Sequence, residues 1–304
     1  MTVHDQIQAN RWRTVIVLAG FGVLVLGVFL GVAGLYDPSL AGLAAAGFLV
    51  YGLFAWRSSG SLVARVSGAR PITRMDHPEL WNAVDNAAIA AGLAKTPDVY
   101  IIDDPAPNAF AAGRNPDTAY VAATTGLLAL LDKRELEGVM AHEIAHVRNR
   151  DVSLMTLAAV LTGSIVLLCD ILMRVSFSTR REGGNPIALV AGLVALVLAP
   201  IVASLLQMSL SRRREYLADA SAVDIAGDAD GLASALAKLA ADTQPLRKVT
   251  RATAHLYIES PLRDHVGLRS GLGGLFETHP PIEERIARLH AMAGGIDPAG
   301  EVYR

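Results

Sequence analysis

Residues 135–146 read ELEGVMAHEIAH, and the last five letters form the pattern H-E-x-x-H. His142 and His146 are four positions apart, so a helix would place them one turn apart on one face, where both imidazoles can bind a single Zn²⁺. Glu143 would lie about 100° around that helix, where its carboxylate can accept a proton from a zinc-bound water without being a ligand. The pattern indicates a hydrolytic zinc site; a surface helix that carries these residues by chance is the alternative.

The sequence before the motif predicts a small unit of helices and strands. Apolar spacing and turn residues predict a helix over 78–93, a strand over 97–102, two strands over 108–114 and 118–124 around the turn Asn115-Pro116-Asp117, and a helix over 126–131. Asp132 and Glu135 have the spacing of a capping box. The helix that carries the motif is therefore expected to begin at this point.

A catalytic zinc usually has three protein ligands and one open position, so the two histidines need a third partner. The best candidate is Glu215 in the segment 211–219, SRRREYLAD, which is expected to form a second helix. Asp219 lies one turn further on the same face, where it can accept the free N–H of a ligand histidine and fix its tautomer. The alternative for this segment is a solvated, charged helix face. We favour the ligand interpretation because a site with two histidines alone would be incomplete.

Composition excludes several classes of partner and site. The chain has 304 residues, of which 52% are hydrophobic, and its mean hydropathy is +0.37, which is typical of a membrane protein. The net charge of -2 provides no basic field for nucleic acid, so no nucleic-acid partner is expected. The single cysteine, Cys169, excludes an intrachain disulfide and a thiolate metal site. Any metal must be held by histidine and carboxylate groups.

Two uncharged stretches near the N-terminus, 14–35 and 40–56, are candidate membrane spans. About 20 apolar residues at 1.5 Å per residue cross a hydrocarbon core of about 30 Å. The short turn between them predicts a helical hairpin. Arginines flank both outer ends, so these ends are expected in the cytoplasm.

Two further apolar stretches are less clear. The stretch 152–173 contains Asp170, the stretch 187–210 contains Pro200, and arginines in the loop between them oppose a simple orientation. Two interpretations remain open, a second pair of spans or a buried helical pair within the catalytic domain. The predicted organisation is an N-terminal transmembrane hairpin (1–56), a first catalytic part (57–151), the second apolar pair (152–210) and a second catalytic part (211–304).

Four segments together resemble the HtpX-type membrane metallopeptidases, which are relatives of the CAAX prenyl endopeptidases. They are HEIAH at 142–146, SRRREYLADA at 211–220, NAFAAGRNPDTAYVAATTGLL at 108–128 and FETHPPIEERIARL at 276–289. The resemblance implies an α+β, zincin-like domain of the gluzincin type with transmembrane helices.

For the individual residues, the resemblance implies that His142, His146 and Glu215 bind one Zn²⁺ per chain, that Glu143 is the general base, and that Asp219 supports a ligand. It also implies a multi-pass protein of the cytoplasmic membrane whose site faces the cytoplasm. Its substrates would be misfolded or damaged membrane proteins, and its role would be in stress response and quality control.

Three other segments have two interpretations each. His279, in the sequence Thr278-His279-Pro280-Pro281, either precedes a helix or stabilises the oxyanion of a peptide-bond intermediate. Asn108, Ala109, Phe110 and Ala111 form either an internal strand or a strand edge on which a peptide substrate pairs. Residues 245–275 form either a flap over the site or a surface loop.

The sequence therefore predicts a membrane-anchored zinc metalloendopeptidase that acts on polypeptides near the membrane. An intramembrane protease is disfavoured because charged residues immediately precede and follow the motif, where lipid would not tolerate them. The remaining alternative is a non-enzymatic membrane scaffold or transporter with a chance motif.

Overall fold

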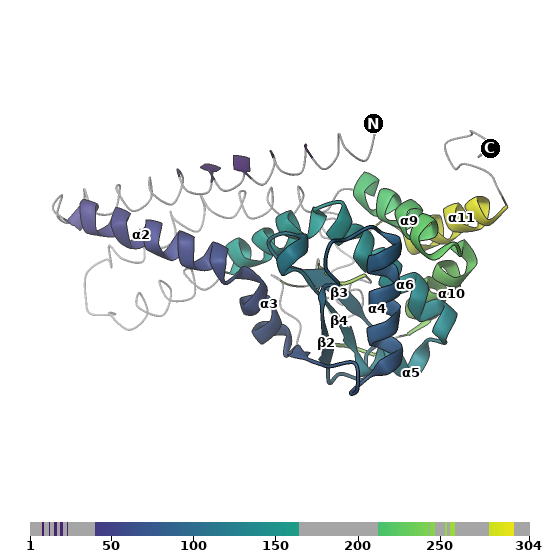
Figure 1. Cartoon of the computed structure of the whole chain (residues 1–304). Helices are drawn as coiled ribbons and strands as arrows, with labels where there is room; N and C mark the ends of the chain where they lie inside the picture. The colour runs from purple at the N-terminus through teal and green to yellow at the C-terminus, as the bar shows by residue number, and fades with distance from the viewer. Residues whose placement is uncertain are drawn as a thin grey trace, which may run out of the picture.

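The computed structural model describes residues 40–163, 212–242, 244–246, 253, 256–258 and 280–294, together with isolated positions between 8 and 23. These residues are mainly helical and contain one small sheet (Figure 1). The helices are α2 (Leu40–Arg57), α3 (Ser59–Ser67), α4 (Pro78–Ala90), α5 (Thr125–Leu130), α6 (Lys133–Arg148), α9 (Arg212–Ala226), α10 (Ala229–Ala241) and α11 (Ile282–Ala293), and residues 151–163 are also helical.

The sheet has four strands in the order β1-β2-β4-β3. The strands are β1 (Arg70–Pro71), β2 (Asp98–Ile102), β3 (Ala109–Ala112) and β4 (Tyr120–Thr124). β2 and β4 are parallel, whereas β1 and β3 pair with their neighbours antiparallel. The prediction of a mainly helical protein with a small sheet is confirmed, and the sheet is mixed. β3 forms one edge of the sheet.

The connection between β3 and β4 follows from its turn residues. Asn115 accepts a hydrogen bond from the Thr118 N–H through its side-chain oxygen at 3.0 Å, and the 3₁₀ turn Pro116–Thr118 reverses the chain. This turn sets the register in which Ala109 lies opposite Ala123. The predicted turn is therefore correct, although the strands are shorter than the predicted ranges.

Helix α6 is fixed at its start and along its length. Asp132 and Glu135 form the predicted capping box, in which each side chain accepts a hydrogen bond from the backbone N–H of the other residue. The helix packs against α4, α9 and α10 and lies below β3. At Gly138, an added Cβ would come within 2.9 Å of the Leu232 nitrogen, so glycine permits the close approach of α10. The motif helix is therefore held from several sides.

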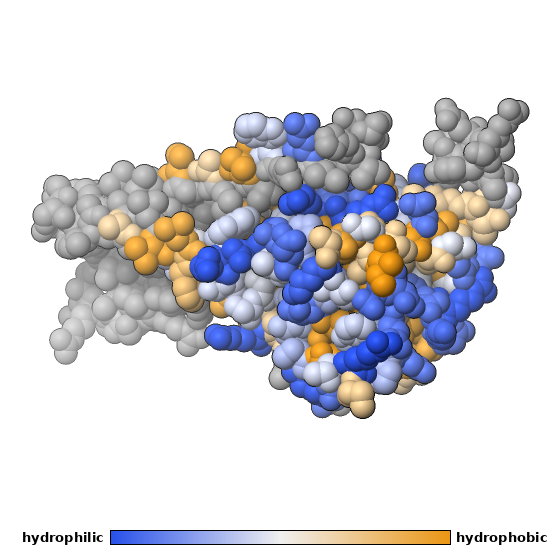
Figure 2. Space-filling model, in the orientation of Figure 1, coloured by the Kyte–Doolittle hydropathy of each residue, from blue (hydrophilic) through white to orange (hydrophobic). Residues whose placement is uncertain are grey.

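Helix α2 projects from the part of the molecule that holds the sheet (Figure 1), and apolar side chains lie on its surface (Figure 2). Val50, Leu53 and Phe54 are 60–71% exposed in the described residues. Of the helices in the described parts of the chain, none combines the length and the apolar character that crossing a bilayer requires.

The described residues include only part of the predicted spans. The stretch 187–210 and most of 14–35 lie outside them. The stretch 152–173 is described as far as residue 163, and its first turns are buried: Met155 and Ala159 belong to an apolar cluster with Phe110 of β3. The start of this stretch is thus part of the core beside the sheet.

Replacement of Glu135 by alanine should lower the free energy of unfolding by about 2 kcal/mol, which denaturant unfolding of the full-length protein would measure. The change removes the capping bond and the hydrogen bonds from Ser234 (2.7 Å) and Lys238 (2.6 Å) on α10. A cap contributes about 1 kcal/mol and a bond to a charged group somewhat more, but Lys238 is 40% exposed and can regain water.

This stabilisation should depend on pH. Burial would raise the pKa of Glu135, but the hydrogen bond from Lys238 and its other partners lower it overall. The stabilisation by Glu135 is complete above the pKa of this residue in the unfolded chain, about 4.3. It is lost as the pH falls through the lower pKa that Glu135 has in the folded protein. The matched control is Glu137→Ala on the same helix, whose side chain is half-buried and should cost much less. Equal losses for both variants would contradict the assignment.

Candidate metal centre

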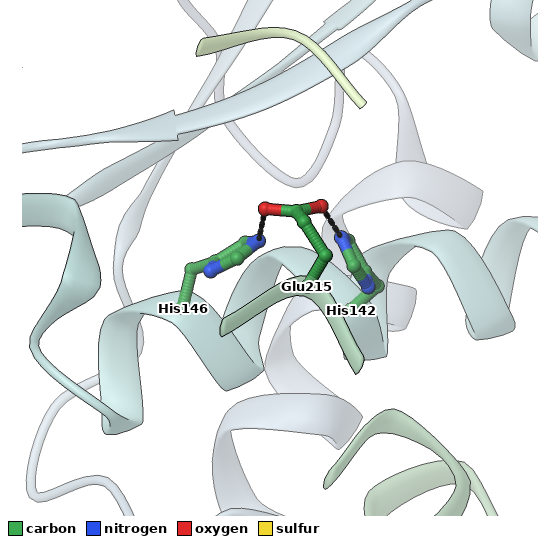
Figure 3. A group of neighbouring side chains, drawn as sticks. All are labelled: His142, His146 and Glu215. Atoms are coloured by element: carbon green, nitrogen blue, oxygen red, sulfur yellow. Dashed lines mark ion pairs between the residues drawn. The ribbon is translucent and has the colours of Figure 1, made fainter. Parts of the chain in front are cut away.

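Three buried side chains from two helices meet at one point. His142 and His146 rise from α6, and Glu215 from α9 places its carboxylate between the two imidazoles (Figure 3). The Nε2 atoms of His142 and His146 lie 3.8 and 3.7 Å from the two carboxylate oxygens of Glu215. One ligand atom from each residue lies within 4.8 Å of the others, and all three residues are buried. The 69 positions between the two segments are thus bridged by the packing of α9 on α6.

The donor set fits a divalent metal ion. Ligand atoms about 2.0–2.1 Å from a tetrahedral Zn²⁺ lie about 3.3 Å from one another, only slightly closer than the nitrogen–oxygen distances here. Both imidazoles turn Nε2 toward Glu215 because their Nδ1 atoms face other carboxylates. Two imidazoles and a carboxylate, without thiolate, suit a catalytic zinc site.

His142 is held by an aspartate and an arginine from two further helices. Its Nδ1 lies 3.0 Å from Oδ1 of Asp219, which is one turn beyond Glu215 on α9. Arg285 of α11 donates two hydrogen bonds to Asp219, at 2.9 and 2.7 Å. Such a carboxylate fixes the tautomer and the ring orientation of a ligand histidine. The structure therefore places Asp219 beside His142, and its supporting role stays a prediction.

His146 has a second set of the same kind. Its Nδ1 lies 3.2 Å from Oδ2 of Asp151, and Nε of Arg214 lies 2.9 Å from the other oxygen of Asp151. Asp151 reaches the histidine because Arg150 adopts a left-handed backbone with φ of 59°, which ends α6 and redirects the chain. Each histidine thus has an aspartate behind it, and each aspartate has an arginine.

The protonation of the two histidines differs with their surroundings. Burial lowers the pKa of His142 to about 4, against the opposing hydrogen bond to Asp219. Burial would also lower the pKa of His146, but the hydrogen bond to Asp151 and the charge of Glu215 raise it to about 9. Burial would raise the pKa of Asp219, but the Arg285 charge lowers it to about 2. His142 and Asp219 therefore keep the forms that a metal ligand and its supporting carboxylate need.

Glu143 lies beside the two histidines and faces the edge of the sheet. Its side chain is 2% exposed, and burial raises its pKa to about 7. The backbone N–H of Ala111 in β3 lies beside this carboxylate and acts against the rise in its pKa. A carboxylate whose pKa lies near neutral pH can both accept and return a proton under physiological conditions.

The other predicted site residues have different outcomes. Asn108 to Ala111 lie at or in the edge strand β3, directly above α6, so the edge interpretation has the required geometry. His279 lies outside the described residues. The roles of both stay predictions.

The sequence did not reveal three residues of the site: Asp151, Arg214 and Arg285. Asp151 and Arg214 are adjacent to known segments, but their charges suggested only solvent exposure. Arg285 is 1% exposed, and its place depends on how α11 packs against α9 and α10. The one available signal was their position in or near the segments that carry the motifs.

A helix with H-E-x-x-H below the edge of a small mixed sheet, with a glutamate from a second helix between the histidines, defines a metallopeptidase. The sequence comparison agrees: the family described as Peptidase family M48 matches residues 75–293, and the chain belongs to this family.

Full-length relatives support the same assignment and confirm the resemblance to HtpX-type peptidases. The chain is 41% identical to "Protease HtpX homolog" of Dictyoglomus thermophilum, over 96% of this chain and 95% of the relative. It is 45% identical to "Protease HtpX homolog" of Tropheryma whipplei, over 95% and 98% of the two chains. Among solved structures, the crystal structure of S. mikatae Ste24p is similar in fold, with a TM-score of 0.50 and 20% identity. That match covers 93% of this chain and 66% of the Ste24p chain.

Replacement of Asp151 by asparagine should weaken zinc binding by about 10- to 100-fold, because it removes the charge that orients His146 and makes it more basic. Competition with a chelator of known zinc affinity would measure this. The matched control is Asp224→Asn, an exposed aspartate of α9 that pairs with Arg148 at the surface. Unchanged zinc affinity in Asp151→Asn, with a native unfolding transition, would contradict this role.

Proposed function

We propose that the protein is a membrane-anchored zinc metalloendopeptidase that binds one Zn²⁺ per chain. The observation that carries the proposal is the meeting of His142, His146 and Glu215 around one buried point, with Glu143 beside it and an edge strand above. The membership in a peptidase family supports peptides as the substrate class.

The residues around the site could divide the hydrolysis of a peptide bond among them. Zn²⁺ held by the three ligands would lower the pKa of a water molecule toward about 7 and polarise the peptide carbonyl. Glu143 would accept a proton from the water as its oxygen bonds to the carbonyl carbon. Glu143 would then give this proton to the amide nitrogen as the carbon–nitrogen bond breaks. His279 remains our candidate for an N–H donor to the oxyanion.

The edge of β3 would hold the substrate in an extended form. Ala109 and Ala111 turn backbone groups away from β4, as the pairing of Asn108 with Thr124 requires. Pairing of this kind recognises the main chain rather than particular side chains, so a broad range of sequences is expected.

We further propose that the hairpin 1–56 and the second apolar pair anchor the protein in the cytoplasmic membrane. The exposed apolar side chains of α2 and the charge distribution around the hairpin support this. The site would then face the cytoplasm, and misfolded membrane proteins would be the substrates in a quality-control role. The proposed organisation keeps the catalytic parts at 57–151 and 211–304.

The Glu143→Gln variant should keep one bound zinc per chain and lose proteolysis by at least about 1000-fold, because the base is removed but the ligands are intact. The double variant His142→Ala with His146→Ala should lose both zinc and activity. Metal analysis of the purified full-length protein, with a casein cleavage assay, would test both. Glu137→Gln is the control on the same helix, since this half-buried side chain pairs with Lys133 rather than with a predicted ligand.

Zinc in less than stoichiometric amounts, or casein cleavage that persists in Glu143→Gln, would overturn the proposal. A protein that behaves identically with and without both histidines would instead be a membrane scaffold or transporter that carries the motif by chance.

A further inference from the structure

A short segment of the chain lies against the edge strand that a substrate would use. Thr124 donates its N–H to the Asn108 carbonyl, so by alternation Ala109 and Ala111 turn their backbone groups away from β4. Ile258 donates its N–H to the outward carbonyl of Ala109 at 3.0 Å. We name residues 256–258 the strap.

Ile258 is held in the way that a residue of a bound peptide would be. Its carbonyl accepts a hydrogen bond from Nη1 of Arg285 at 3.4 Å, and its side chain is 2% exposed among apolar residues on the α6 side of the sheet. Tyr257 packs with the opposite cluster, where its ring lies 5.0 Å from that of Phe110. Leu256 and Tyr257 thus pack on one side of the sheet, and Ile258 packs on the other.

The groups that hold the strap also belong to the metal centre. Arg285 pairs with Asp219, the carboxylate behind His142. Ala111 lies two residues further along the same strand edge, and its backbone N–H lies beside the Glu143 carboxylate. A peptide that reached the histidines along this edge would need the Ala109 carbonyl, which Ile258 already occupies.

We propose that the strap is an internal competitor of the peptide substrate, and that the position of Ile258 is a substrate subsite selective for a branched aliphatic side chain. Substrate binding then displaces the strap, and Arg285 transfers its hydrogen bond from the Ile258 carbonyl to a carbonyl of the substrate. This inference rests on the proposed peptidase function.

The displacement requires few bonds to break. In the described residues one backbone hydrogen bond joins the strap to β3, and the Arg285 contact is long for a charged donor. A free substrate supplies the same two bonds, so the exchange leaves no buried group unpaired. The apparent affinity for substrate is reduced by the fraction of molecules in which the strap is closed.

Steady-state kinetics on the full-length zinc protein test the competition. Ile258→Gly removes the buried side chain and should lower the KM for labelled casein by about 5- to 20-fold while kcat changes by less than about 2-fold. Ile258→Pro, which deletes the N–H donor, should act in the same direction. The control is Leu246→Ala, a buried residue of the Phe110 cluster, for which no fall in KM is expected.

Amide hydrogen exchange provides a second measurement that does not depend on these variants. The probe is a synthetic peptide with the sequence of residues 254–260, AHLYIES, added to zinc-loaded Glu143→Gln protein. The peptide should bind, and the Ile258 amide should change from slow to fast exchange. A peptide with aspartate in place of the isoleucine should bind at least about 10-fold more weakly.

The outcomes separate the two proposals. A protein without zinc, or without activity in the wild type, defeats the peptidase function itself. If zinc content and casein cleavage are normal but the KM of Ile258→Gly is unchanged or raised, the peptidase function stands and the proposal of a competing strap is contradicted. Peptide binding that leaves the Ile258 amide protected from exchange also contradicts the strap proposal. This measurement holds even if the substituted proteins fail to fold.

Discussion

The structure depends on charge compensation in a buried space. Charged groups cannot be buried unless partners neutralise them, and here ionisable side chains from four segments meet out of contact with water. The buried carboxylates are those of Glu143, Asp151, Glu215 and Asp219, and the buried guanidinium groups are those of Arg214 and Arg285. Four negative and two positive charges leave two negative charges when the imidazoles are neutral. A divalent cation would supply the missing balance; without one, the raised pKa values of His146 and Glu143 favour protonation of these two groups.

Patterns along the chain were sufficient for the elements and for the central residues, because both depend on local spacing. The capping pair Asp132 and Glu135 located the start of α6, and H-E-x-x-H placed two histidines on one face. Glu215 could be inferred only because a two-histidine site needs a third ligand. Arg285 could not be inferred, since a buried arginine becomes intelligible only when α11 is known to lie against Asp219. The strap was equally hidden, because residues 245–275 carry no periodicity that would place Ile258 at a sheet edge.

The edge strand and the motif helix form one functional unit through Ala109 and Ala111. Ala109 offers its carbonyl outward, and the backbone N–H of Ala111 lies beside the carboxylate of Glu143, the proposed base. Small side chains at both positions allow β3 to lie close to α6, since a larger residue would separate the sheet from the helix. The strap and a substrate cannot both use this edge, because Ile258 already donates its N–H to the outward carbonyl of Ala109.

The ion pair between Asp151 and Arg214 joins two points of the chain that border the apolar stretches. Asp151 immediately precedes the stretch 152–173, and Arg214 follows the stretch 187–210 by four positions. Their contact at 2.9 Å therefore brings together the two ends of the segment 152–213. Because Asp151 also orients His146 and Arg214 immediately precedes Glu215, a shift of either apolar stretch would move a metal-binding side chain. The places of Asp151 and Arg214 in the sequence thus link the geometry of the candidate metal centre to both ends of the segment 152–210.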